Sequence, residues 1–139
     1  LDVMLTHAGA KLLECTARLS GGFDSQWTSP ATGRHPMRQL LQLSCGLPVE
    51  PQPAPQGGAA CAAILPQTAG VVPALPPVAR GVEVVWTIQP GQRIAPAVHN
   101  GERAGYVLIN APSPRAAWQT ALQIAQVLAT AVDASLTPP

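Results

Sequence analysis

The sequence predicts an α+β fold, in which an antiparallel sheet is flanked by helices. Two observations predict it: short segments of alternating apolar and polar residues are joined by turn residues, and two longer segments carry apolar residues at helical spacing. The 139 residues are 47% hydrophobic and 11% charged, so the chain can fill a core and is not a charge-driven disordered chain. Its 12 glycines and 16 prolines make turns and loops prominent as well.

A strand pair is predicted at the start of the chain. Residues 1–6 and 10–18 alternate between apolar and polar side chains. His7-Ala8-Gly9 between them is typical of a three-residue hairpin loop, with Gly9 at the position that needs a positive φ.

A long polar loop over residues 19–33 and a helix are predicted next. Pro36 lies in the first turn of this helix, and Gly46 and Pro48 end it. Its apolar stripe comprises Met37, Leu40, Leu41 and Leu43.

Further strands are predicted in the second half of the chain. Residues 59–65 and 82–88 have strand composition, and Asn100-Gly101 is typical of a type I′ turn. We therefore expect this turn to join residues 92–99 to a strand over 103–109.

The last element is predicted to be a helix that opens at Ser113 and Pro114, an N-cap followed by a first-turn proline. Its apolar residues at helical spacing are Ala117, Trp118, Ala121, Leu122, Ile124, Ala125 and Leu128. Trp118 and Trp86 are expected to pack in the core, and Cys15 to be a buried small hydrophobe.

Charge and composition exclude several classes of function. A net charge of +1 gives no polybasic surface for nucleic acid or anionic lipid, and 4% aromatics give no stacking platform for single strands. No apolar run reaches the roughly 20 residues of a membrane span. Three widely spaced cysteines and the absence of a signal-peptide pattern favour reduced thiols and a cytoplasmic location.

Pairing across the predicted first hairpin brings two carboxylates together. Val3 falls opposite Leu13, and Asp2 falls opposite Glu14 on one face of the sheet. Like charges that face each other destabilise a strand pair, and a bound cation of the Mg²⁺ type would remove this conflict. Arg18, farther along the same face, could hold an anionic group with two hydrogen bonds. Alternatively, this is a solvent-facing strand side on which the carboxylates and Arg18 simply pair.

The segment Leu13–Gly22 (LECTARLSGG) resembles the last magnesium-binding strand of ATP-grasp carboxylate–amine ligases, the superfamily of biotin carboxylase, carbamoyl-phosphate synthetase and L-amino-acid ligases. That family pattern is an acidic residue, a hairpin, Glu-x-Asn-x-Arg and a loop of small residues. The step from Asp2 to Glu14 also looks like the biotin carboxylase spacing. The resemblance implies that Glu14 bridges two Mg²⁺ ions on the ATP phosphates and that Asp2 is the first acid. It also implies that Arg18 holds the substrate carboxylate or acyl phosphate, beside a backbone donor at Gly21.

Thr16 departs from the pattern, because the family's asparagine at this position is a metal ligand. A threonine hydroxyl can ligate weakly, and members of the amino-acid-ligase branch also lack this asparagine. The resemblance thus implies ATP and Mg²⁺, or Mn²⁺ in its place, as cofactors, with Asp2, Glu14 and Thr16 as the metal set. The single lysine among eight basic residues also suggests a bacterial source.

The resemblance extends over nearly the whole chain and implies its organisation. Residues 1–50 would be the C-terminal part of the ATP-grasp catalytic domain, 51–58 a Pro/Gly-rich connector, and 59–139 a small C-terminal α+β subdomain. The lysines and the glycine loop of the first ATP-grasp lobe have no counterpart here, since Lys11 is the sole lysine and no phosphate-binding glycine motif occurs.

We therefore expect the missing lobe to act in cis or in trans, and the isolated chain to be inactive. The substrates implied are a small-molecule carboxylate and an amine, joined through an acyl phosphate into an amide. The competing hypothesis is a non-catalytic, truncated ATP-grasp-like module that serves in packing or small-ligand binding.

Overall fold

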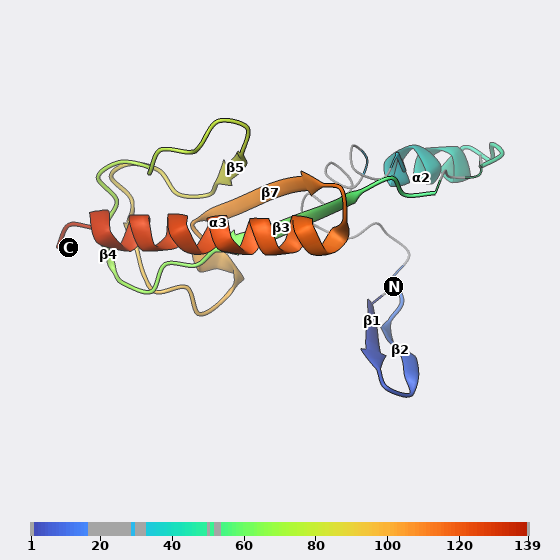
Figure 1. Ribbon diagram of the computed structural model, residues 1–139, viewed down its shortest axis with the longest axis horizontal. Coiled ribbons are helices and arrows are strands. Elements are labelled where there is room, and N and C mark those ends of the chain that lie inside the picture. The colour runs from blue at the N-terminus through green and yellow to red at the C-terminus, as the bar shows by residue number, and fades with distance from the viewer. Residues whose placement is uncertain (1, 17–28, 30–32, 50, 52–53, 139) are drawn as a thin grey trace.

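The computed structural model describes residues 2–16, 29, 33–49, 51 and 54–138 (Figure 1). Its order is a β-hairpin, a short helix, and then antiparallel strands followed by a long helix. This is the α+β class that the sequence predicts. No helix within the described ranges has the length and apolar character needed to cross a membrane.

The hairpin consists of β1 (Asp2–Thr6) and β2 (Gly9–Glu14). Thr6 pairs with Gly9, so the turn has two residues, and the expected three-residue loop is wrong. The side chain of Thr6 tightens this turn, because its hydroxyl donates to the Gly9 carbonyl at 2.8 Å and accepts from the Ala8 N–H at 3.2 Å. Gly9 has the predicted positive φ, at 100°.

A β-bulge corrects the register at the open end of the hairpin. Val3 pairs with Leu12, not with Leu13 as expected, but the register shifts between Asp2 and Val3 and leaves Leu13 as the extra residue. As a result Asp2 lies opposite Glu14, as predicted.

The second strand is shorter than the alternation suggests. It ends at Glu14, so Cys15 and Thr16 follow the strand and do not belong to it. Cys15 is exposed, which contradicts the expectation of a buried side chain, because no described element packs over this part of the hairpin.

The helix α2 (Pro36–Ser44) has the predicted bounds. Its last turn is closed by Gly46 at φ 68° and by the Leu47 N–H, which donates to the Gln42 carbonyl at 2.8 Å. No residue of α2 is buried, and the hairpin and α2 lie apart from the remaining elements (Figure 1).

The C-terminal unit is built on a three-stranded antiparallel sheet with the order β3 (Gly58–Ile64), β7 (Gly105–Ala111), β5 (Glu83–Trp86). The helix α3 (Pro114–Ser135) packs across β3 and β7 (Figure 1). A second small sheet pairs β4 (Gly70–Val71) with β6 (Arg93–Ile94).

The expected hairpin at Asn100-Gly101 is wrong. Asn100–Glu102 forms a 3₁₀ turn, η1, and β6 pairs with β4 instead of β7. His99 caps this turn by accepting from the Gly101 N–H, while the Glu102 carboxylate accepts from the Val98 and His99 N–H groups. This local capping satisfies the backbone without the positive φ that a type I′ turn requires.

The start of α3 is as predicted, since the Ser113 hydroxyl accepts from the Ala116 N–H at 3.2 Å. The buried side of α3 is mostly alanine and packs on the alternate buried residues of β3 and on Val107. Its buried residues are Ala117, Ala121, Ala125, Leu128 and Val132.

Trp118 does not belong to this buried face. It is 51% exposed, so the prediction that it packs in the core is wrong. Small side chains let the helix approach the sheet closely, and a tryptophan fits only beside that contact, on the flank of the helix. Trp86 is half-buried and packs against the core, in agreement with the prediction.

Candidate functional site

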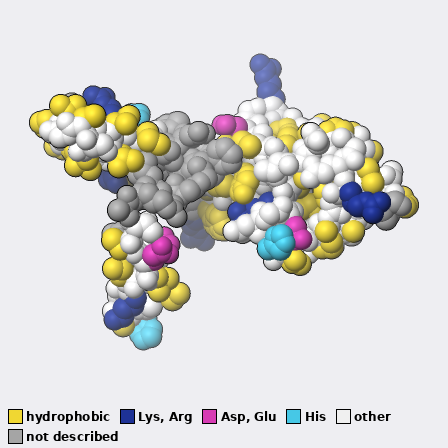
Figure 2. Space-filling model, turned by 180° about the vertical axis from the view of Figure 1, so that it is seen from behind, with side chains coloured by type: hydrophobic (Ala, Val, Ile, Leu, Met, Phe, Trp, Pro, Cys, Tyr) yellow, Lys and Arg dark blue, Asp and Glu magenta, His cyan; other side chains and the backbone are white. Residues whose placement is uncertain are grey.

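The first candidate site is the carboxylate pair at the open end of the hairpin. Asp2 and Glu14 are directly paired across β1 and β2, and both residues are exposed. Neither side chain forms a hydrogen bond or an ion pair with any described residue. Figure 2 shows the hairpin standing out from the surface, with acidic atoms near its base and apolar side chains along it.

Their pairing depends on the bulge at Leu13. Continuing the register of Val3 with Leu12 would place Asp2 opposite Leu13 and Glu14 beyond the end of β1. The bulge therefore sets two acidic side chains side by side, where electrostatic repulsion works against the strand pair.

The other predicted site residues lie after β2. Thr16 is half-buried, two residues beyond Glu14. Arg18 and Gly21 lie outside the described residues. The described residues contain no cluster of three or more His, Cys, Asp or Glu side chains able to hold a metal ion, so the hairpin contributes two carboxylates alone.

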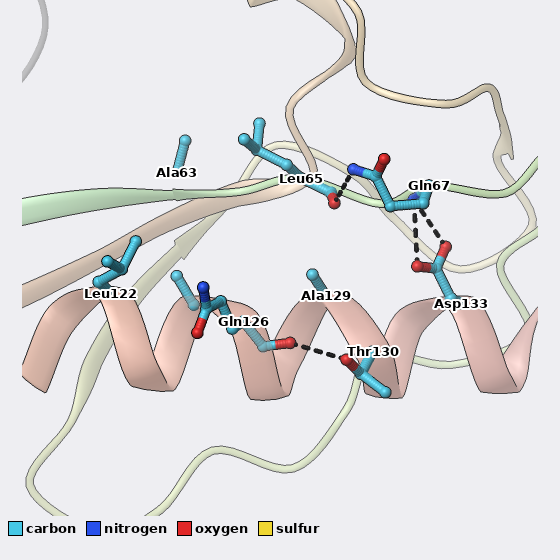
Figure 3. Close-up of a pocket in the computed structure, with 9 residues that line it drawn as sticks. Ala63, Leu65, Gln67, Leu122, Gln126, Ala129, Thr130 and Asp133 are labelled. Atoms are coloured by element: carbon cyan, nitrogen blue, oxygen red, sulfur yellow. Dashed lines mark hydrogen bonds between the residues drawn. The ribbon is translucent and has the colours of Figure 1, made fainter.

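A groove lies between the end of β3 and α3, with a volume of about 470 Å³ (Figure 3). We call it the β3–α3 groove. Its residues are Ala63, Leu65, Gln67, Leu122, Ala125, Gln126, Ala129, Thr130 and Asp133. No short sequence pattern predicts this groove, because it depends on how α3 lies against one edge of the sheet.

Asp133 closes one end of the β3–α3 groove. Its carboxylate accepts from the backbone N–H groups of Gln67 and Thr68 at 3.0 Å, and from the Thr68 hydroxyl at 2.7 Å. These hydrogen bonds tie α3 to the segment after β3, so Asp133 acts as a structural clamp.

A smaller pocket of about 240 Å³ lies beside η1. Arg93, Glu102 and Arg103 contribute to its lining. The guanidinium of Arg103 donates to Asn100 and to the Tyr106 hydroxyl, and its carbon lies 5.6 Å from the Tyr106 ring centre. Arg103 is thus held by its neighbours, and the Glu102 carboxylate accepts from the Val98 and His99 N–H groups.

Residues 64–133 match the family described as L-amino acid ligase C-terminal domain 2. The match begins at the last residue of β3 and covers the strands that follow and most of α3. The chain belongs to this family. No curated protein and no solved structure matches the chain.

Membership of the L-amino acid ligase C-terminal domain 2 family places the chain in a ligase, ATP-grasp-associated context, in agreement with the resemblance seen in the sequence. The matched residues include the β3–α3 groove from Leu65 onward and the pocket beside η1. They do not include Asp2, Glu14 or Thr16, so the roles of these residues depend on the hairpin geometry and on the sequence pattern alone.

Proposed function

We propose that this chain supplies the C-terminal part of an ATP-dependent carboxylate–amine ligase. In this proposal Asp2, Glu14 and Thr16 hold Mg²⁺, while Arg18 and Gly21 hold the anionic group of the substrate. The observation that carries the proposal is the direct pairing of Asp2 with Glu14 across the hairpin. Two exposed carboxylates at one place in a strand pair are unfavourable unless a cation lies between them.

The residues present fit a magnesium ion. Mg²⁺ prefers oxygen ligands and is commonly bound by one or two carboxylates together with substrate phosphates and water. Asp2 and Glu14 have oxygens not engaged by other described residues, and the Thr16 hydroxyl would add a weak oxygen ligand. When bound, Mg²⁺ would neutralise charge on the ATP phosphate oxygens.

The chain's own groups then have positional and electrostatic tasks. The γ-phosphoryl group of ATP passes to a carboxylate oxygen of the substrate, which gives an acyl phosphate and ADP. An amine next attacks the acyl carbon, and inorganic phosphate leaves as the amide forms. Arg18 can hold the carboxylate with two parallel hydrogen bonds and offset the charge that the transfer concentrates there, and the Gly21 N–H can donate beside it.

Membership of the ligase-associated family supports this proposal. It requires an upstream ATP-grasp lobe, in cis or in trans, to supply the other wall of the nucleotide site. The proposal keeps residues 1–50 as part of the catalytic domain, 51–58 as the connector and 59–139 as the subdomain. We further propose a cytoplasmic location, where ATP and reduced thiols are both abundant.

A second candidate is a non-catalytic module that uses the C-terminal unit for packing or ligand binding. One observation favours it: the family match and the buried core both lie in the C-terminal unit, while the hairpin buries no side chain. In that case the carboxylates of Asp2 and Glu14 would be solvated surface charges.

The deciding experiment uses Glu14→Gln, which keeps the shape of the side chain and removes its charge. In an enzyme that joins this chain to its upstream lobe, we expect ligation, followed as ADP release, to fall at least about 100-fold. Glu83→Gln, at an exposed carboxylate on β5, is the matched control and should leave the rate unchanged. Full activity in Glu14→Gln would favour the non-catalytic module.

Metal binding can be measured on the 139-residue chain without turnover. Binding to the chain should enhance the water-proton relaxation rate of a Mn²⁺ solution above that of free Mn²⁺. Glu14→Gln should reduce this enhancement more than Glu83→Gln does. Thr16→Asn adds an amide oxygen and should bind Mn²⁺ as well as or more tightly than the unmodified chain. In the complete enzyme, Arg18→Ala should lower both substrate affinity and kcat.

A further inference from the structure

The pocket beside η1 brings together two basic residues from different parts of the C-terminal unit. Arg93 begins β6, and Arg103 directly follows η1. Both residues line the pocket, whereas Arg80 and Arg115, the other arginines described in this unit, do not. The packing of β6 beside η1 therefore places two guanidinium groups at one hollow of the surface.

Neither arginine has an ion pair with a carboxylate in the described part of the chain. Glu102 also lines the pocket, but its carboxylate is engaged in capping η1. One oxygen accepts from the Val98 and His99 N–H groups, and the other lies 3.2 Å from His99 Nε2. Two guanidinium groups and one carboxylate leave the lining with a net positive charge.

The guanidinium of Arg103 is held in place before any ligand binds. It donates to the Tyr106 hydroxyl at 3.2 Å and to the Asn100 side chain, and it lies 5.6 Å from the Tyr106 ring centre. The Thr87 hydroxyl donates to the Arg103 carbonyl and fixes the backbone as well. A guanidinium has five N–H groups, so three are left for a ligand once these two partners are counted. Because the side chain is already ordered, a ligand that binds to it loses less free energy in ordering it.

Gln92 adds a neutral donor to the lining. This residue is half-buried, and its side-chain carbonyl accepts from the Gln89 N–H at 3.1 Å. No described residue accepts from its NH₂ group. Ile88 and Ile94 supply an apolar part of the lining, where charge interactions are stronger than in open water.

The chemistry of this lining selects an oxyanion. The N–H groups of a guanidinium match two oxygens of one carboxylate or phosphate group. The pocket volume of about 240 Å³ is below the range of roughly 300–1,000 Å³ that larger organic ligands occupy. The pocket therefore suits a small oxyanion, such as inorganic phosphate or a short carboxylate, better than a nucleotide.

We propose that the pocket beside η1 binds a small oxyanion, through a phosphate or carboxylate group held by Arg93 and Arg103. The Gln92 side-chain amide donates to the same group. The whole pocket lies within residues 64–133, which match the ligase-associated family. This site uses none of the residues proposed to bind magnesium or substrate, so it does not depend on the proposed ligation.

The test is a titration of the ¹⁵N-labelled 139-residue chain, followed by proton–nitrogen correlation NMR. Sodium phosphate and sodium acetate are added in separate series at neutral pH, with sodium chloride keeping the ionic strength constant. We expect the Arg103 Nε–H and the Gly101 backbone N–H signals to shift and to saturate, with a Kd of about 1–10 mM. The anion with the lower Kd identifies the ligand group as phosphate or carboxylate.

Three variants separate a built site from general charge attraction. Arg93→Gln removes a charge at an exposed position and should weaken binding at least about 10-fold. Arg103→Lys keeps the charge but loses the paired N–H groups, and should weaken binding at least about 5-fold. Arg115→Gln is the matched control, because it removes the same charge from an exposed position of α3 outside the lining. It should leave the Kd unchanged within about twofold.

Three results would overturn the proposal. The first is the absence of saturation by either anion up to about 50 mM. The second is equal weakening by Arg93→Gln and Arg115→Gln, which would show that the anion responds only to the overall charge of the chain. The third is an unchanged Kd in both Arg93→Gln and Arg103→Lys.

Discussion

The N-terminal elements and the C-terminal unit both carry apolar stripes, but they use them differently. In the described structure, the apolar side chains of β1, β2 and α2 are largely exposed, with Leu5 at 83%. In the C-terminal unit the alternate residues of β3 and one side of α3 are buried against each other. The comparison shows that an apolar pattern predicts an element, whereas burial requires a second element that packs against it.

The comparison also separates stability from proposed chemistry. The hairpin carries the proposed metal ligands and contributes nothing to the core, while the C-terminal unit carries the core and the family match. Substitutions in the two regions should therefore have effects of different kinds.

The largest effect is expected from a charge placed in the core. Val107 is fully buried on the central strand, so Val107→Asp should lower the free energy of unfolding by at least about 4 kcal/mol. Leu5→Asp, at an exposed position of the hairpin, should change it by less than about 0.5 kcal/mol. Urea denaturation followed by far-UV circular dichroism measures both. Equal losses in the two variants would show that the hairpin packs on a core of its own.

An intermediate effect is expected at the Asp133 clamp. Asp133→Ala leaves the N–H groups of Gln67 and Thr68 without their acceptor, so the free energy of unfolding should fall by about 1–3 kcal/mol. Asp2→Ala removes a carboxylate without such partners and should stay within about 0.5 kcal/mol in the same urea titration. If Asp2→Ala lowered the free energy of unfolding as much as Asp133→Ala, the hairpin would contribute to stability, which would contradict the comparison.

The smallest effect is expected at a helix cap. Ser113→Ala removes the acceptor for the Ala116 N–H and should lower the free energy of unfolding by about 1 kcal/mol, and Ser113→Asp should restore most of it. Ser44→Ala, in α2, loses the hydrogen bond from its hydroxyl to the Leu40 carbonyl but should change the unfolding of the C-terminal unit very little. Thermal denaturation of the three variants distinguishes the outcomes.

The sequence predicted elements well where a local signal determines them. Ser113-Pro114 opens α3, Pro36 and Gly46 bound α2, and strand composition identifies β3. The prediction from sequence failed at Asn100-Gly101, where His99 and Glu102 form a capping box around a 3₁₀ turn and the expected type I′ turn does not form.

Other failures concern which side of an element is covered. The helical spacing in α3 included Trp118, but the contact with the sheet is made by alanines and leaves the tryptophan on the flank. Cys15 was expected to be buried on the basis of an alternation that stops at Glu14. The partner strand of β6 and the β3–α3 groove depend on tertiary packing, which no short sequence pattern specifies.

The candidate carboxylate pair was predicted correctly, although one step of the reasoning was wrong. The expected loop is one residue too long, and the bulge at Leu13 compensates for it, so Asp2 and Glu14 still face each other. The roles proposed for Asp2, Glu14, Thr16, Arg18 and Gly21 all stay predictions.

Because of the bulge at Leu13, the number of residues between Asp2 and Glu14 decides whether the two carboxylates face each other. Removing Leu13 would give a regular ladder, with Val3 opposite Leu12 and Asp2 opposite Glu14 in unbroken succession. An insertion in the turn or in either strand would instead move one carboxylate to the other face of the sheet or past the end of its partner. In evolutionary terms, this hairpin should tolerate many substitutions and the loss of its one surplus residue, but few insertions between Asp2 and Glu14.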